Sequence, residues 1–289
     1  IVPAVAQALG IILQGTGTPI DQLARRLRDQ ELLLVLDNME HLLAPSSGAG
    51  AGALINRLLN FAPGVTILTT SRVRLEVQGE HPFTVVGLDV PPATSEQEMA
   101  ERYSAIALFM DSARRARPGY APAGDDLAQI ARICRLVEGM PLAVTLAAAW
   151  VEMLSPCEIA DQIQSGLDFL AADLQDLPER QRSMRTVCDA SWQMLTQPER
   201  EVFARLSVCY GGFELDAAEQ VARADLRILM QLLHKSFLER TPEGRYQTHE
   251  LLRQYAEGEL ARSPGDLVRA RDAHCAYFVS LLQHWLPAL

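Results

Sequence analysis

Residues 32–36 read Leu-Leu-Leu-Val-Leu and are followed at once by Asp37-Asn38. Five apolar residues without alternation are typical of a central strand in a parallel sheet, buried on both faces. A second run, residues 65–70 (Val-Thr-Ile-Leu-Thr-Thr), comes after an expected helix at 54–61 and closes at Ser71-Arg72. Strand, helix and strand joined by short links predict a doubly wound α/β sheet.

The rest of the chain reads as helical. Two short helices are expected at 1–10 and 20–29, and apolar residues recur at helical spacing from residue 103 to 172. Residues 183–261 predict three helices followed by a hairpin with a Thr-Pro-Glu-Gly turn, which is a winged-helix outline. The last stretch, residues 266–285, is amphipathic and helical.

Composition excludes several classes of protein. The 289 residues suggest about two domains, and 48% hydrophobic with 21% charged residues is the balance of a folded, water-soluble chain. The 36 acidic residues exceed the 26 basic ones, so the net charge of −10 gives no footprint for nucleic acid. Lys235 is the single lysine and follows no glycine-rich run, which excludes a lysine-bearing P-loop.

The cysteines and the apolar runs indicate the cellular compartment in which the protein is expected. The five cysteines are scattered without a Cys-x-x-Cys pair, so neither a disulfide framework nor a zinc site is indicated, and a reducing cytoplasm fits best. The longest apolar run, residues 140–151, is shorter than the roughly 20 residues of a membrane span. Because the chain starts without Met in what reads as mid-helix, we expect a fragment of a larger protein.

Asp37 and Glu40 are the first candidates for chemistry. Asp37 follows the central strand, at the edge where α/β sheets bind ligands and where a carboxylate can hold the water shell of Mg²⁺. The alternative is that Asp37 caps a helix beginning near Met39. Glu40 could act as general base, or it could be the acidic first-turn residue that a helix favours.

Four further residues are candidates for binding. Arg72 could stabilise a terminal phosphate or be a surface arginine at a strand end. Gly139 and Pro141 end one helix and open the next, which offers a turn for a ligand edge or is a plain helix corner. His249, after the hairpin, could donate to a phosphate or simply start the next helix.

Four motifs in order carry a family resemblance: residues 32–42, residues 68–72 (Leu-Thr-Thr-Ser-Arg), residues 138–143 (Glu-Gly-Met-Pro-Leu-Ala) and residues 246–255. Together they resemble the NB-ARC-like signal-transduction ATPases with numerous domains (STAND), as found in large bacterial regulators of the LuxR and AfsR types. The resemblance covers nearly the whole chain.

This resemblance implies a domain order. Residues 1–92 would be a partial P-loop NTPase α/β domain for nucleotide, and residues 93–176 an all-α lid domain. Residues 177–263 would be a winged-helix domain, and residues 264–289 the start of a helical, tetratricopeptide-type repeat region.

The resemblance also implies roles for the site residues. Asp37 would be the Walker B acid for Mg²⁺, and Arg72 the sensor for the γ-phosphate. Gly139 and Pro141 would form the lid turn against adenine, and His249 would contact the β-phosphate of ADP. ADP would hold an inactive state, and exchange for ATP would drive self-association.

Two departures from the family pattern limit the chemistry. No Gly-Lys-Ser/Thr run precedes Asp37, so this chain alone is expected to hold ADP or ATP weakly. Asn38 stands where relatives often have a second acid, so hydrolysis is expected to be slow at most.

Three functions follow. The first is a regulatory ATP/ADP switch that touches DNA through domains outside this chain. The second is a nucleotide-free interaction scaffold. The third is DNA binding through the winged helix, which the balance of 10 basic and 12 acidic residues in 183–262 opposes.

Overall fold

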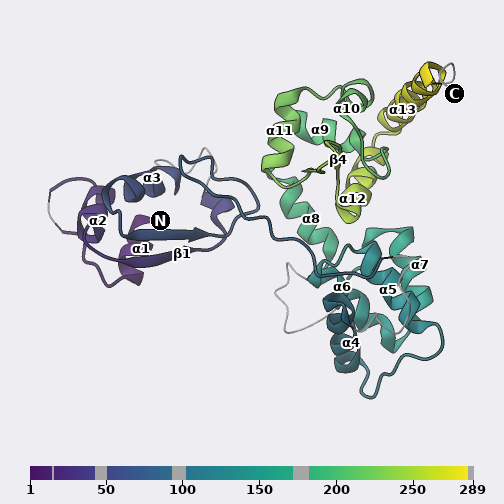
Figure 1. Ribbon diagram of the computed structural model, residues 1–289, viewed down its shortest axis with the longest axis horizontal. Coiled ribbons are helices and arrows are strands. Elements are labelled where there is room, and N and C mark those ends of the chain that lie inside the picture. Colours follow the sequence, from purple (N-terminus) through teal and green to yellow (C-terminus); the bar gives the residue numbers. More distant parts are fainter. Residues whose placement is uncertain (15, 43–50, 93–101, 172–181, 286–289) are drawn as a thin grey trace. The chain divides into compact units, whose positions relative to one another are not determined.

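The structure, a computed structural model, describes residues 1–14, 16–42, 51–92, 102–171 and 182–285. It divides the chain into two compact units (Figure 1). Unit 1 comprises residues 1–84 with 234–236, and unit 2 comprises residues 85–233 with 237–289. The expected linker at Leu177-Pro178 lies outside the described residues.

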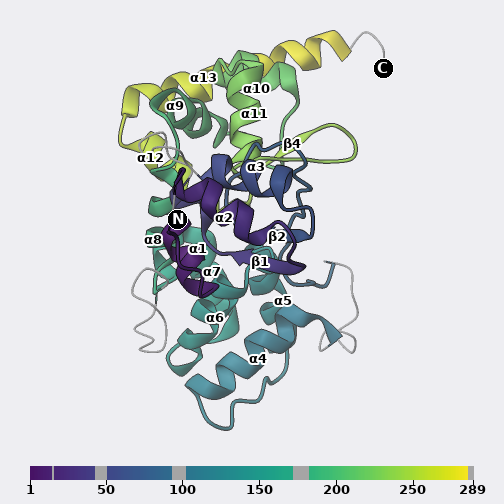
Figure 2. The same cartoon turned by 90° about the vertical axis from the view of Figure 1, so that its left-hand side faces the viewer.

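Unit 1 is built on a parallel strand pair, as the sequence predicts. Strands β1 (Leu32–Leu36) and β2 (Val65–Thr69) pair in register from Leu32 opposite Val65 to Leu36 opposite Thr69. Figure 2 shows the two strands side by side. The remaining elements are helices α1 (Val2–Ala8), α2 (Pro19–Leu27) and α3 (Ala51–Phe61) and the 3₁₀ helix η1 (Met39–Leu42).

One face of this sheet is buried. Apolar side chains of α1, α2 and α3 cluster with Leu34 of β1 and Val65 of β2; fully buried examples are Leu23 and Leu58. The start of α2 is fixed locally, because the Thr18 hydroxyl accepts from the Asp21 amide at 3.3 Å and Pro19 opens the first turn.

The prediction that residues 32–36 are buried on both faces is wrong. Leu34 is 7% exposed, whereas Leu33 and Val35 are 58% and 57% exposed, and Leu68 of β2 is 55% exposed. Alternate side chains of a strand point to opposite faces, and the described helices pack against the face that carries Leu34. The other face therefore stays in solvent in the described part of the chain.

The first half of unit 2 is a group of helices. It contains α4 (Ser104–Ala116), α5 (Asp126–Leu136), α6 (Pro141–Ala149), η4 (Trp150–Glu152), α7 (Pro156–Ser165), η5 (Leu167–Phe169) and α8 (Met184–Trp192). Helix α7 starts where the sequence offers a capping box, since Ser155 and Glu158 satisfy each other's backbone amides. These helices bury a first cluster of apolar side chains that includes Ile106, Phe109 and Ile130.

The second half of unit 2 has three helices and a hairpin in the predicted order, although the predicted range of 183–261 also contains α8 before them and α12 after them. Helices α9 (Gln197–Leu206), α10 (Leu215–Ala222) and α11 (Leu226–His234) precede strands β3 (Glu239–Arg240) and β4 (Tyr246–Gln247), which pair antiparallel. Helices α12 (Glu250–Ala261) and α13 (Pro264–Trp285) follow. Among the described residues no helix combines the length and apolarity needed to cross a membrane.

Helix α12 contributes to both apolar clusters of unit 2. Its N-terminal half places Leu251 and Tyr255 in the first cluster. Its C-terminal half places Ala256 and Leu260 in a second cluster with side chains of α9, α10 and α11. This helix therefore joins the two halves of the unit.

The corner between α5 and α6 is crossed closely by the chain that enters unit 2. The Leu88 amide donates to the Gly139 carbonyl at 2.8 Å, and Gly139 has a φ of 66°. A Cβ on Gly139 would lie 2.1 Å from the Leu88 carbonyl oxygen. This position therefore requires glycine for two reasons, its left-handed backbone and its close backbone contact.

We predict that Gly139→Ala lowers the free energy of unfolding by about 2–4 kcal/mol, because it adds left-handed strain and a steric clash. Gly258→Ala is the matched control. Gly258 lies on the exposed side of α12, and a methyl group added there would meet no other atom within 4 Å, so the change should stabilise by about 0.5–1 kcal/mol. Urea denaturation followed by tryptophan fluorescence measures both, since all three tryptophans lie in residues 85–289. Equal effects of the two substitutions would contradict the account of the corner.

Candidate functional site

The carboxyl ends of β1 and β2 bring Asp37 and Thr70 together. The Thr70 hydroxyl donates to one carboxylate oxygen of Asp37 and accepts from the Asn38 amide at 3.0 Å. The Asn38 side-chain amide donates to the other Asp37 oxygen at 3.3 Å. Asp37 is exposed at the strand end, so its carboxylate is held in place and open to solvent.

Glu40 and Arg72 form a second pair at these strand ends. The Arg72 guanidinium lies 3.8 Å from Glu40 Oε1, with side chains 46% and 4% exposed respectively. The other oxygen of Glu40, Oε2, is buried without a hydrogen-bond partner among the described residues. A buried carboxylate oxygen without a donor is costly, so this position calls for a water or another donor.

Thr70 is a site residue that the sequence patterns do not single out. The available signal is a hydroxyl immediately after β2. Since Leu36 pairs with Thr69, the residues that follow, Asp37 and Thr70, must also lie next to each other. Knowledge of the parallel register would have revealed the contact.

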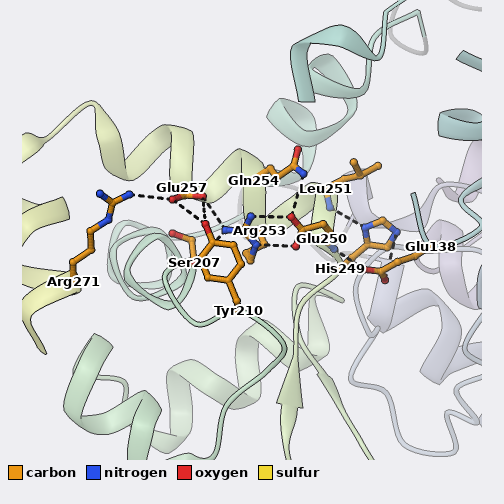
Figure 3. A network of polar contacts seen from close by, with 10 residues as sticks. All are labelled: Glu138, Ser207, Tyr210, His249, Glu250, Leu251, Arg253, Gln254, Glu257 and Arg271. Carbon is orange, nitrogen blue, oxygen red and sulfur yellow. Dashed lines mark hydrogen bonds and ion pairs between the residues drawn. The ribbon is translucent and has the colours of Figure 1, made fainter. Parts of the chain in front are cut away.

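The second set of predicted residues lies in unit 2, at the α5–α6 corner and the start of α12. Gly139 and Pro141 form the expected corner, since α5 ends just before Gly139 and Pro141 opens α6. His249 is the N-cap of α12, and its Nδ1 accepts from the Leu251 amide at 3.2 Å. Glu138, which the sequence patterns do not single out, accepts from the Glu250 amide at 2.8 Å (Figure 3).

The Nε2 nitrogen of His249, which makes no hydrogen bond among the described residues, is the notable feature of this set. Because Nδ1 accepts a hydrogen bond, the neutral ring carries its proton on Nε2. Nε2 is buried without a hydrogen-bond partner among the described residues, and Glu138 Oε2 lies 3.8 Å away. The ring therefore holds a donor that is available to an acceptor.

Arg253 organises the first turns of α12. Its guanidinium forms a bidentate pair with Glu250, with both bonds at 2.8 Å, and binds Glu257 at 2.8 Å and the Ser207 carbonyl at 3.0 Å. It also lies 3.9 Å from the centre of the Tyr210 ring. Figure 3 shows Arg253 between its two carboxylates. This buried arginine joins α12 to the end of α9.

The surroundings of His249 are acidic. A cavity of ≈ 290 Å³ is lined by His249 and Arg253 and by three carboxylates, those of Glu138, Glu239 and Glu250. The positive charge of Arg253 is already shared between Glu250 and Glu257. The cavity therefore has an excess of negative charge, which opposes binding of a bare anion. The Nε2 proton of His249 is the group in this cavity that could attract one.

The Arg253 pair has a pH dependence. Burial alone raises the pKa of Glu250, but the hydrogen bonds and charge of Arg253 more than offset it, so the pKa lies below its usual value of 4.5. A lowered folded-state pKa means that the stabilisation is present above pH 4.5 and is lost as the pH falls through the folded-state value.

We predict that Arg253→Met lowers the free energy of unfolding by roughly 2–4 kcal/mol at pH 7, because two partly buried carboxylates, those of Glu250 and Glu257, lose their hydrogen bonds to the guanidinium. The deficit relative to the unsubstituted chain should shrink below pH 4.5, as Glu250 becomes protonated. Arg262→Met is the matched control, since Arg262 follows the last residue of the same helix, its own side chain is 69% exposed, and it pairs with a single carboxylate, that of Glu259. Urea denaturation at pH 7 and pH 4 measures both, and a similar loss from the two variants would contradict the role of Arg253.

The predicted site residues therefore fall into two groups. Asp37, Glu40 and Arg72 lie at one sheet edge in unit 1, and the structure adds Thr70 to them. Gly139, Pro141 and His249 belong to unit 2, and the structure adds Glu138 and Arg253 to these.

The chain is similar in sequence to mycobacterial proteins. No family model matches the chain. The chain is 34% identical over 286 residues to a protein of Mycobacterium tuberculosis H37Rv named as a candidate HTH-type transcriptional regulator. That match covers 96% of this chain and 30% of the relative, so the chain spans about a third of the regulator's length. A second, uncharacterised M. tuberculosis protein is 34% identical over 276 residues, which is 91% of this chain and 66% of that protein.

A solved structure is also similar over much of the chain. It is a signal-transduction ATPase with numerous domains and a tetratricopeptide repeat sensor from Pyrococcus horikoshii, 14% identical, covering 91% of this chain and 36% of that one. The TM-score of 0.29 is too low to establish a shared fold. Of the two sequence relatives, the one with a functional name is a candidate transcriptional regulator.

Proposed function

We propose that this chain is the regulatory core of an ATP/ADP-dependent switch in a multidomain bacterial transcriptional regulator. The observation that carries the proposal is the set of polar groups at the carboxyl ends of β1 and β2. There an exposed Asp37 carboxylate is held by Thr70, and Glu40 pairs with Arg72. Parallel α/β sheets bind ligands at this edge. The similarity to regulators over nearly the whole chain supports the regulatory part of the proposal.

The unit 1 residues fit a hydrated Mg²⁺ carried by a nucleotide. Mg²⁺ prefers oxygen ligands and retains several waters, and Asp37 offers an exposed, oriented carboxylate. Bound Mg²⁺ neutralises phosphate charge. Glu40, whose buried Oε2 has no partner among the described residues, can position a water, and Arg72 can turn from Glu40 to a γ-phosphate because half of its side chain is exposed.

The unit 2 residues would contact the phosphate and the adenine of the nucleotide. His249 would donate its Nε2 proton to a phosphate oxygen of ADP, since Nε2 makes no hydrogen bond among the described residues and only a long contact, 3.8 Å, with Glu138. Gly139 and Pro141 would form a turn against adenine. The acidic cavity around His249 works against tight phosphate binding, so most affinity must come from a phosphate cradle that this chain does not contain.

The order of α9, α10, α11 and the β3–β4 hairpin supports a winged-helix domain. In such a domain α11, which precedes the hairpin, is the helix that would face DNA. Its exposed side carries Leu226 and Met230, which are 62% and 47% exposed. Arg227 is also exposed on this helix, but a segment with a net charge of −2 is unsuited to DNA phosphates, so we assign DNA contact to domains outside this chain.

A nucleotide-free scaffold is the second candidate function. Two observations favour it. The contact with Leu88 explains Gly139 without a ligand, and the carboxylates around His249 oppose an anion. In this version the α/β fold survives as structure, and partners rather than nucleotides control the protein.

Calorimetric titration of ADP and Mg-ATP distinguishes the two functions. We predict weak or no binding by the 289-residue chain and tight ADP binding by a version extended upstream with its native sequence, which supplies the phosphate cradle. If neither version binds nucleotide, the proposed ATP/ADP switch is wrong and the nucleotide-free scaffold is supported. Cytoplasmic location and self-association on activation belong to the same proposal, and hydrolysis should be slow.

Two substitutions in the intact gene product test the assigned roles. Arg72→Ala should weaken ATP-driven activation about tenfold or more, because a guanidinium–phosphate contact is lost, and His249→Ala should raise basal activity by loosening the ADP-bound state. Reporter transcription and bound nucleotide content measure both. Arg28→Ala and His81→Ala, two exposed positions in unit 1, are the controls. Equal loss of output from Arg72→Ala and His249→Ala at unchanged nucleotide content would contradict these roles.

A further inference from the structure

Glu138 connects the α5–α6 corner to the first turn of α12. Its Oε1 accepts from the Glu250 amide at 2.8 Å, and its Oε2 lies 3.8 Å from His249 Nε2. Figure 3 shows the Glu138 carboxylate beside His249 at the helix start. A carboxylate that accepts from an N-terminal helix amide makes one of the stronger hydrogen bonds in proteins.

Glu138 holds this position at a cost to its own backbone. Its φ of 49° is left-handed, and it directly follows the end of α5 at Val137. Such a conformation is unfavourable for a residue with a Cβ, and glycine is usual at the end of a helix for that reason. The sequence therefore has a glutamate where a glycine would be unstrained.

The bond to Glu250 lies at one end of a shared helix. The N-terminal half of α12 buries Leu251 and Tyr255 in the first apolar cluster, and its C-terminal half is buried in the second. The Leu251 amide is satisfied separately by His249. Glu138 is thus a side chain from the first half of the unit that fastens the backbone start of α12.

The neighbouring charges cannot replace this bond. The Glu250 carboxylate is engaged by Arg253, and Gln254 donates to it at 3.1 Å. Glu239, which lines the same cavity, is a third carboxylate and offers no donor. If the Glu138 carboxylate moves away, the Glu250 amide loses its acceptor and hydrogen-bonds to solvent instead.

We propose that Glu138 is a latch that keeps the N-terminal half of α12 docked on the first cluster. While its carboxylate accepts from Glu250, Leu251 and Tyr255 stay buried and the His249 ring stays in the cavity. When it releases, that half of α12 loosens together with His249, and the C-terminal half remains in the second cluster. This conformational device does not require a nucleotide and goes beyond the proposed switch.

Amide hydrogen exchange of the 289-residue chain, measured by NMR without nucleotide, tests the latch. Glu138→Ala should speed exchange about tenfold or more at residues 250–255, because the bond that docks this half is lost. Residues 257–261 should exchange as before, which also shows that the variant is folded. Glu138→Gln retains an acceptor oxygen and should restore most of the protection.

Glu239→Ala is the matched control, since it removes a carboxylate from the same cavity without touching α12's first amide. It should leave exchange at residues 250–255 unchanged. If Glu138→Ala speeds exchange at the Glu250 amide alone, Glu138 only caps the first amide of α12, and the proposal that it keeps the N-terminal half of the helix docked is wrong. Equal effects of Glu138→Ala and Glu239→Ala, or no rescue by Glu138→Gln, would overturn it as well.

Discussion

The left-handed corner at Glu138-Gly139 is the constraint on which the rest of unit 2 depends. Two consecutive residues with positive φ end α5 and turn the chain into α6 at Pro141. The same corner receives the backbone of Leu88 against Gly139 and sends the Glu138 carboxylate to the start of α12. A change of backbone at this point therefore affects the chain's entry to the unit and its shared helix together.

The sequence predicts the local elements well because short-range patterns determine them. The runs at 32–36 and 65–69 are strands, the Gly139–Pro141 spacing is a helix corner, and His249 starts a helix. The prediction that both faces of the sheet are buried is wrong, because the pattern of apolar residues predicts a strand but does not show which elements pack against it. The solvent-facing Leu33, Val35 and Leu68 show that the covering of this strand pair is incomplete in the described residues.

The residues that sequence patterns do not reveal act over long separations. Thr70 reaches Asp37 across 33 positions, and Glu138 reaches Glu250 across 112. Arg253 reads in sequence as an ordinary helical arginine, yet it is 6% exposed and joins α12 to α9. Register and tertiary packing decide such contacts, and neither can be read from composition or spacing.

Electrostatics sets the limit on the proposed switch. In the described residues, the sheet edge of unit 1 has the exposed Asp37 carboxylate and an arginine already paired with Glu40, and the cavity in unit 2 has the His249 Nε2 donor among carboxylates. A nucleotide gains little from either set alone. In the proposed switch, most of the binding free energy would come from a phosphate cradle outside this chain, and these residues would distinguish ADP from ATP.

A crystal structure of the intact gene product with ADP and Mg²⁺ tests this claim most directly. We predict a phosphate oxygen within hydrogen-bonding distance of His249 Nε2 and the Asp37 carboxylate on the water shell of Mg²⁺. A structure in which the nucleotide touches neither residue, or crystals that contain no nucleotide at saturating ADP, would contradict it.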